Sequence, residues 1–227
     1  MANKSGNAYA LTMLCPILPG LPPDAGMGAN TQTYTTLLRD ALQTVRMNET
    51  SPMARVPNTY LCRFYVLSDV LYQGSPALLE HLKSDYLVFS SNFHGDLEPY
   101  VTGMWNAAEP EVRAILWHCV GTENVCDAQS FIKYVKACQV TTTFFFNGST
   151  DEPLAQQLKN LYLKQEFSKF VFANQGKSPL ELQKAFWQFV DRTQPSNVAS
   201  PTWKPGAYHL DRVETGGAPA VPGGEPK

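Results

Sequence analysis

The sequence lacks a strong excess of either charge. Its 227 residues include 18 Lys and Arg against 20 Asp and Glu, which gives a formal net charge of −2 and a pI near 6.1. Proteins that bind nucleic acids usually carry a basic patch and a raised pI, so the composition argues against a nucleic-acid partner. With 44% hydrophobic residues, the chain is long enough to bury one substantial core.

Long apolar runs and targeting signals are missing as well. Arg, Ser or Thr interrupts each apolar stretch before it reaches the ~20 residues that a membrane helix needs. The N-terminal segment MANKSGNAYALTMLCP has an apolar part too short for a signal peptide. Five cysteines without regular spacing are typical of reduced thiols rather than of a disulfide framework. We therefore expect a cytoplasmic protein without a membrane span.

Local catalytic motifs are also absent. The sequence contains no C-x-x-C, H-E-x-x-H, G-x-G-x-x-G, G-x-x-x-x-G-K-[ST] or G-x-S-x-G. Cys119 and Cys126, with His118 nearby, lack the spacing and the second ligand pair of a zinc site. We expect no metal site, and any reaction has to be inferred from isolated side chains.

What the sequence does contain is a series of strand and helix patterns separated by Pro, Gly and polar links. The β-prone runs cover residues 8–15, 59–71, 85–92 and 140–146. Helical spacing covers residues 33–47, 96–116 with a break expected at Pro110, 131–138, 152–173 and 179–192. The order β-α-β-β-α-β followed by two helices predicts an α+β fold of the ferredoxin-like type, with an antiparallel sheet and helices on one face.

The domain prediction is a single ferredoxin-like α+β domain over residues 1–192, which includes the C-terminal helices. Residues 193–227, rich in Pro and Gly, are expected to form an extended arm and a disordered tail. Residues alternate between the two faces of a strand, and both faces of strand 59–71 are largely apolar. The face without helices should therefore be buried against a second copy or by the C-terminal helices, and a homodimer is the leading expectation.

Several segments resemble one family. LTMLCPILPG, SPMARVPNTYLCRFYVL, LVFSSNFHGDLEPYV and LWHC resemble a poorly characterised bacterial family of the dimeric α+β-barrel superfamily, over roughly residues 8 to 150. That superfamily includes antibiotic-biosynthesis monooxygenases, chlorite dismutases and dye-decolourising peroxidases, several of them haem proteins. The resemblance implies a dimeric α+β barrel with a pocket between sheet and helices. It leaves the cofactor unknown, because haem and a cofactor-free reaction both occur in the superfamily.

Two polar side chains are the candidate catalytic residues. Arg63 lies in the middle of an apolar strand, where it could clamp a carboxylate or a haem propionate, or else form a structural ion pair with Asp96 or Glu98. His94 lies at a strand end in NFHGD, where a neutral imidazole could act as a base or a metal ligand, or could be an exposed turn residue.

Tyr65, Phe89 and Asn92 are the candidate substrate-binding residues, since they lie on the same strands as Arg63 and His94.

The sequence leaves three hypotheses for the function of the protein. The leading hypothesis is a small-molecule oxidoreductase or monooxygenase that acts on a hydrophobic substrate. The alternatives are a non-catalytic ligand-binding or accessory protein and a structural, partner-binding protein. Late aromatic residues at helical spacing are interpreted as core or dimer packing: Phe167, Phe170, Phe172, Phe186, Trp187 and Phe189.

Overall fold

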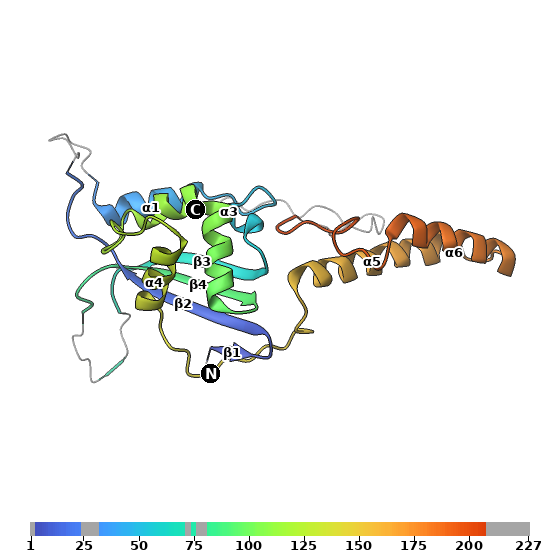
Figure 1. Ribbon diagram of the computed structural model, residues 1–227, viewed down its shortest axis with the longest axis horizontal. Helices are drawn as coiled ribbons and strands as arrows, with labels where there is room; N and C mark the ends of the chain where they lie inside the picture. Colours follow the sequence, from blue (N-terminus) through green and yellow to red (C-terminus); the bar gives the residue numbers. More distant parts are fainter. Residues whose placement is uncertain (1–2, 24–31, 71–73, 76–80, 208–227) are drawn as a thin grey trace.

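The computed structural model describes residues 3–23, 32–70, 74–75 and 81–207. Its centre is an antiparallel sheet of four strands in the order β1-β2-β4-β3 (Figure 1). The strands are β1 (Lys4–Ser5), β2 (Ala8–Pro16), β3 (Thr59–Leu67) and β4 (Tyr86–His94). The α+β fold class is confirmed, with β1 as a strand that the sequence patterns did not predict.

Four helices belong to the body of the protein. They are α1 (Tyr34–Thr44), the short α2 (Pro52–Arg55), α3 (Leu97–Leu116) and α4 (Ala128–Cys138). Helices α1, α3 and α4 lie on one side of the sheet (Figure 1). The opposite side, called the open face below, is made by alternate residues of β2, β4 and β3, among them Leu61, Arg63 and Tyr65.

Local signals explain the helix boundaries. Thr33 caps α1 by accepting a hydrogen bond from the backbone N–H of Thr36, and Asp127 and Ser130 form a reciprocal capping box at the start of α4. Pro110 cannot donate a backbone hydrogen bond within α3, and Ala108 leaves helical geometry at φ −144°. The predicted break of this helix at Pro110 is therefore confirmed.

The core forms between the sheet and the helices because every second strand residue points toward them. Phe93 of β4 stacks between Tyr9 and Tyr100, with ring centroids 5.1 and 3.6 Å away. The Tyr100 hydroxyl lies 2.8 Å from the Ser91 hydroxyl and 3.2 Å from that of Thr59. Burial raises the pKa of Tyr100 to about 12, so the phenol stays neutral inside this core.

The predicted fourth strand, residues 140–146, is wrong. The Val140 N–H donates to the Thr12 carbonyl at 2.8 Å, but the segment then leaves the sheet without forming a strand. The rest of this edge of β2 is occupied by the N-terminal segment, since β1 pairs with Ala8 and Tyr9 and Asn3 bonds to Ala10. Phe144 is consequently 82% exposed.

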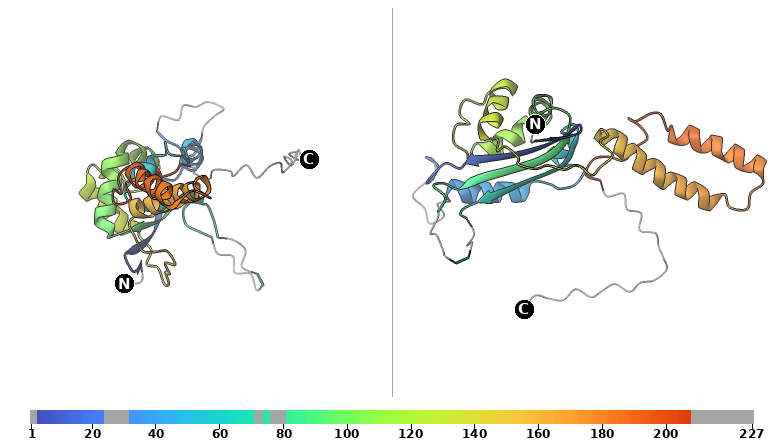
Figure 2. Two further views of the ribbon diagram at one scale, coloured as in Figure 1. Left: turned by 90° about the vertical axis from the view of Figure 1, so that its right-hand side faces the viewer. Right: turned by 90° about the horizontal axis from the view of Figure 1, so that it is seen from below.

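The two C-terminal helices do not cover the open face. Helices α5 (Leu154–Ala173) and α6 (Pro179–Thr193) form a hairpin that extends away from the sheet (Figures 1 and 2). Of the two covers expected for that face, the helices of the same chain are therefore excluded. None of the residues 154–193 belongs to the cluster of buried side chains around the sheet.

A short arm runs back from α6 toward the body. Lys159 of α5 is fully buried, and its ammonium group donates to the carbonyls of Thr193 and Pro201, both at 2.7 Å. The arm then reaches the loop after α1, where a Cβ on Gly206 would lie 2.7 Å from the Asn48 carbonyl oxygen. The predicted tail beyond it, residues 208–227, lies outside the described residues.

Candidate functional site

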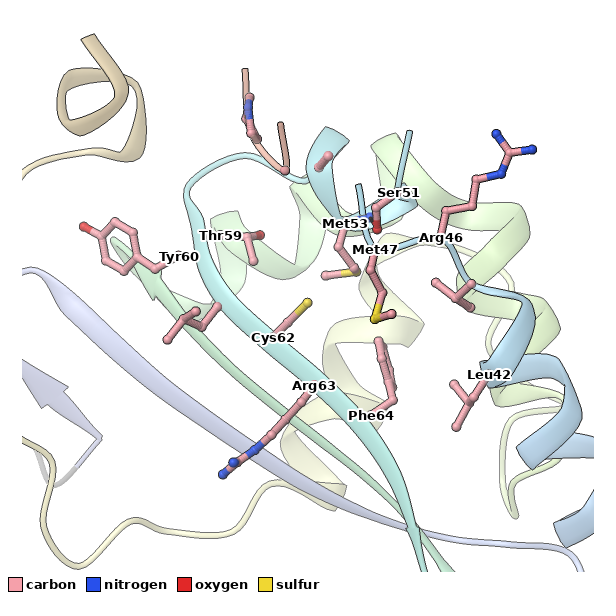
Figure 3. Close-up of a pocket in the computed structure, with 15 residues that line it drawn as sticks. Leu42, Arg46, Met47, Ser51, Met53, Thr59, Tyr60, Cys62, Arg63 and Phe64 are labelled. Atoms are coloured by element: carbon pink, nitrogen blue, oxygen red, sulfur yellow. Dashed lines mark hydrogen bonds between the residues drawn. The ribbon is translucent and has the colours of Figure 1, made fainter. Parts of the chain in front are cut away.

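A groove of about 470 Å³ lies between α1, α2 and the outer edge of β3 (Figure 3). Its walls are mainly apolar side chains from these three elements and the loop between α1 and α2: Leu42, Val45, Met47, Met53, Cys62 and Phe64. Pro205 and Gly206 of the returning arm also line it. A volume of this size is in the range of ~300–1,000 Å³ that is typical of small-molecule sites.

Strand β3 separates this groove from the open face. Because side chains alternate along a strand, Cys62 and Phe64 point to the groove, whereas Arg63 leaves β3 on the opposite side (Figure 3). Tyr60 also projects away from the groove, because a β-bulge between Thr59 and Leu61 shifts the register at that end of β3.

The groove offers little acid–base chemistry. No Asp, Glu or His is among the described residues that line it. Burial raises the pKa of the Cys62 thiol above its usual value, so Cys62 stays protonated and weakly nucleophilic. Arg46, at the rim, supplies a cation whose side chain is directed outward (Figure 3). The described lining of the groove is therefore mainly apolar and contains no carboxylate or imidazole that could act as a general acid or base.

A second, smaller depression of about 330 Å³ lies on the open face. Leu61, Arg63, Ser90 and Asn92 contribute to its lining, and the strand register places Leu61 opposite Asn92 and Arg63 opposite Ser90. Leu61 is 68% exposed and the neighbouring Tyr65 is 45% exposed. Two large, exposed apolar side chains therefore flank a guanidinium on the open face of the described structure.

Arg63 forms neither of the ion pairs considered for it. Asp96 pairs with Lys4, and Glu98 pairs with Lys136. Arg63 is exposed, and it makes no hydrogen bond or ion pair with any residue that the structure describes. Because Arg63 is exposed, its charge is not buried and needs no structural partner, so the guanidinium is available to an anion on the open face.

His94 lies at the end of β4 and belongs to a short hydrogen-bonded chain. The Tyr60 hydroxyl donates its proton to the Glu152 carbonyl at 2.6 Å and lies 3.0 Å from Nδ1 of His94. A phenol has one proton to donate, so Nδ1 of His94 must carry the proton that Tyr60 accepts. The basic lone pair of the neutral ring is then on Nε2, which has no hydrogen-bond partner in the described part of the chain.

The segment that supplies the Glu152 carbonyl is anchored to the sheet one residue earlier. The carboxylate of Asp151 accepts the backbone N–H of Asn7 at 2.9 Å and a hydrogen bond from the Asn7 side-chain amide at 3.1 Å. The close approach requires Gly6, at φ +63°, because a Cβ there would lie 2.3 Å from Asp151 Oδ2. This clamp holds both the partner of Tyr60 and the start of the hairpin.

Four of the five predicted site residues share one face of the sheet, although only Arg63 and Asn92 line the same depression. Arg63, Tyr65, Asn92 and His94 all lie on the open face. Phe89 lies on the opposite face, 4% exposed and stacked on Phe64 with ring centroids 4.5 Å apart.

The predictions missed the role of Tyr60 and the whole groove beside α1 and α2. Plain alternation along β3 placed Tyr60 on the same side as Cys62 and Phe64. A bulge next to Thr59 leaves no recognisable signal in the sequence, so the partner of His94 could be found only in the structure.

Three cysteines lie close together at the end of the core. Cys15 and Cys119 are buried, and Cys138 at the end of α4 is partly buried beside them. A hydrogen bond from the Cys15 thiol lowers the pKa of Cys138 to about 7, and the same interaction together with burial raises the pKa of Cys15. Within the described ranges, no three His, Cys, Asp or Glu residues are arranged to hold a metal ion.

The described residues do not fit a haem. The space between sheet and helices, where the family resemblance implies a pocket, is a void of about 20 Å³. His94 and His118 line neither the groove nor the depression, and His118 is buried with Nδ1 bonded to the Ile115 carbonyl.

Comparison with known proteins gives no relative: no protein-family model, curated protein or solved structure matches this chain. The resemblance to the dimeric α+β-barrel superfamily remains an expectation from sequence motifs.

Proposed function

We propose that this protein binds a small apolar molecule in the groove between α1, α2 and β3. The observation that carries the proposal is a cavity of about 470 Å³ with apolar walls from three separate elements. Met47 and Met53 are among them, and methionine side chains adapt to irregular ligands because they are unbranched and flexible. With no acid–base pair in the groove, binding is favoured over chemistry there.

The binding test uses the apolar anion 1-anilinonaphthalene-8-sulfonate as the probe. Met47 is highly exposed at the groove, so Met47→Asp should leave the fold intact. It should weaken binding by about tenfold, because a carboxylate would be desolvated against the probe. Phe144→Asp, which changes an exposed apolar residue outside the groove, is the matched control. Equal affinities for both variants and the unchanged protein would exclude the groove.

We further propose that the protein is a homodimer built through its open face, as in a dimeric ferredoxin-like α+β barrel. The arrangement β2-β4-β3 and the exposed Leu61 and Tyr65 support this. Leu61→Asp should then reduce the mass measured by sedimentation velocity from dimer to monomer, with Met47→Asp unchanged. A monomeric protein without any substitution would refute the dimer and leave the groove proposal intact.

A second candidate function is oxidation of a bound substrate on the open face, favoured by the free Nε2 of His94 on the same face as Arg63. In this role His94 removes a proton from an acidic substrate, and Arg63, further along the same face, binds an anionic group of that substrate. Dissolved O2 is the oxidant: it takes up the electron pair of the resulting carbanion by adding to it as a peroxide. His94→Gln and Arg63→Met should each abolish oxygen consumption while the protein stays folded. Turnover unchanged in both variants would exclude the two residues from catalysis.

A further inference from the structure

The far half of the α5–α6 hairpin has an unusual apolar surface. We define residues 167–187 as the hairpin tip. Exposed large apolar side chains gather there: Phe167, Val171, Phe172, Leu180, Leu182, Phe186 and Trp187. Phe172 and Leu180, which flank the turn between the helices, are each 76% exposed. In the half of the hairpin nearer the sheet, Leu161 is the exposed large apolar residue.

The hairpin cannot cover this surface by itself. Phe170 of α5 packs on Phe186 and Phe189 of α6, with ring centroids 6.1 and 5.2 Å apart. These contacts use one side of each helix, whereas Phe172 and Trp187 remain outside them. A two-helix hairpin has no further layer to offer, and it points away from the sheet (Figure 2). Among the residues that the structure describes, no other element covers the tip, so this surface is available to a partner.

The charge of the hairpin indicates what that partner is. Residues 154–193 include six Lys or Arg and three Asp or Glu, a net charge of +3 in a chain whose formal net charge is −2. The ammonium groups of Lys164 and Lys184 form no hydrogen bond or ion pair with the described residues, and Lys177 bonds to the neutral Asn174 side chain. Three lysines in or close to the tip, Lys164, Lys177 and Lys184, therefore form no ion pair with the described residues and are available for anions.

We propose that the hairpin tip docks onto an anionic lipid surface. Helices that lie at a membrane interface combine Lys and Arg with Trp, Phe and Leu and bury the apolar residues about 5–10 Å deep. Phe172, Leu180 and Trp187 would enter the interface, and the lysines would contact lipid phosphates. Within the described ranges no helix has the length and apolar composition to cross a bilayer, so the contact is peripheral.

A second copy of the hairpin fits these observations less well. Two hairpins that pair as a four-helix bundle need an apolar seam along their whole length, but the exposed apolar residues are concentrated at the tip. Two copies of a hairpin with a net charge of +3 would also repel each other. An anionic surface needs no apolar seam, because it can cover the end of the hairpin alone. Its charge is opposite to that of the hairpin, so the two attract each other.

The test is co-sedimentation of the full chain with vesicles of phosphatidylcholine, with or without phosphatidylserine. Binding should require phosphatidylserine and should fall as salt rises from about 0.1 to about 0.5 M. The double variant Phe172→Ser, Leu180→Ser should bind at least about tenfold more weakly. Phe144→Ser, the same chemical change at an exposed residue outside the hairpin, should bind like the unchanged protein.

Two further variants separate charge from insertion. Lys164→Gln with Lys184→Gln should weaken binding to phosphatidylserine vesicles without changing the fold, as judged by circular dichroism. Trp187→Phe should still bind but should lose the blue shift of Trp emission that vesicles cause. Absence of binding, equal binding to both vesicle types, or equal losses in the tip variant and Phe144→Ser would overturn the proposal. A tip variant that dissociates a larger assembly without affecting lipid binding would assign the tip to a second copy.

Discussion

Replacing Tyr60 by Phe tests the chain that orients His94. The substitution keeps the ring, which lies at an edge-to-face angle to the His94 imidazole at 6.4 Å, and removes only the hydroxyl. Two groups then lose their hydrogen bond to this hydroxyl: the Glu152 carbonyl, 2.6 Å away, and Nδ1 of His94, 3.0 Å away. Tyr60→Phe is therefore a selective change in hydrogen bonding.

The expected cost follows from these two bonds. A neutral hydrogen bond contributes about 0.5–1.5 kcal/mol net, and both of these are partly buried. Because water can reach part of the site, we expect Tyr60→Phe to lower the free energy of unfolding by about 1–2 kcal/mol. Tyr65→Phe is the matched control, since no described residue bonds to the Tyr65 hydroxyl, and it should cost less than about 0.5 kcal/mol.

Two measurements check this prediction. Urea unfolding gives the free-energy change, and ¹⁵N NMR of the imidazole reports which nitrogen carries the proton. In the unchanged protein the neutral ring should be protonated on Nδ1, and the Nδ1–H population should fall in Tyr60→Phe. The reasoning is refuted if the unchanged protein carries the proton on Nε2, or if Tyr60→Phe and Tyr65→Phe unfold alike.

Two more predictions concern the clamp and the thiols. Gly6→Ala should destabilise the fold by about 2–3 kcal/mol in urea unfolding, because strain at positive φ adds to a clash with Asp151. Gly20→Ala, also at positive φ but in open space, should cost only about 1–2 kcal/mol; equal costs would argue against the clash. Alkylation of Cys138 should accelerate as pH rises through about 7, because the lowered pKa makes the thiolate available above that pH. In a Cys15→Ala variant, which lacks the hydrogen bond to the thiolate, this midpoint should move up toward 9; an unmoved midpoint would contradict the assigned cause.

Much of the secondary structure could be predicted because its causes are local. Period-two patterns located β2, β3 and β4, and helical spacing located α1 and the two long C-terminal helices. The break in α3 followed from Pro110 alone, since proline lacks the donor that a helix interior needs. These features depend on residues within a few positions of one another, so a single sequence carries them.

The sequence could not show which of two distant segments forms a given hydrogen bond or ion pair. The VTTTFFF run has the composition of a strand, but Asn3 and β1 reach the edge of β2 and take its hydrogen bonds. Asp96, considered as a partner for Arg63, pairs with Lys4 instead because the N-terminal segment lies beside it.

The candidate site likewise has some features that local sequence predicts and others that depend on contacts between distant segments. Local alternation along β3 predicted that Arg63 and Tyr65 share one side of that strand, and the sheet register agrees with it. That Asn92 lies on the same face follows only from the pairing of β3 with β4. The contact between Tyr60 and Glu152 joins residues 92 positions apart, and the apolar groove joins Leu42 of α1 to Gly206 of the returning arm. Such contacts form only after the backbone has been placed, because the energy that selects them comes from groups that are remote in sequence. The tertiary structure alone therefore decided where this protein has room to bind a ligand.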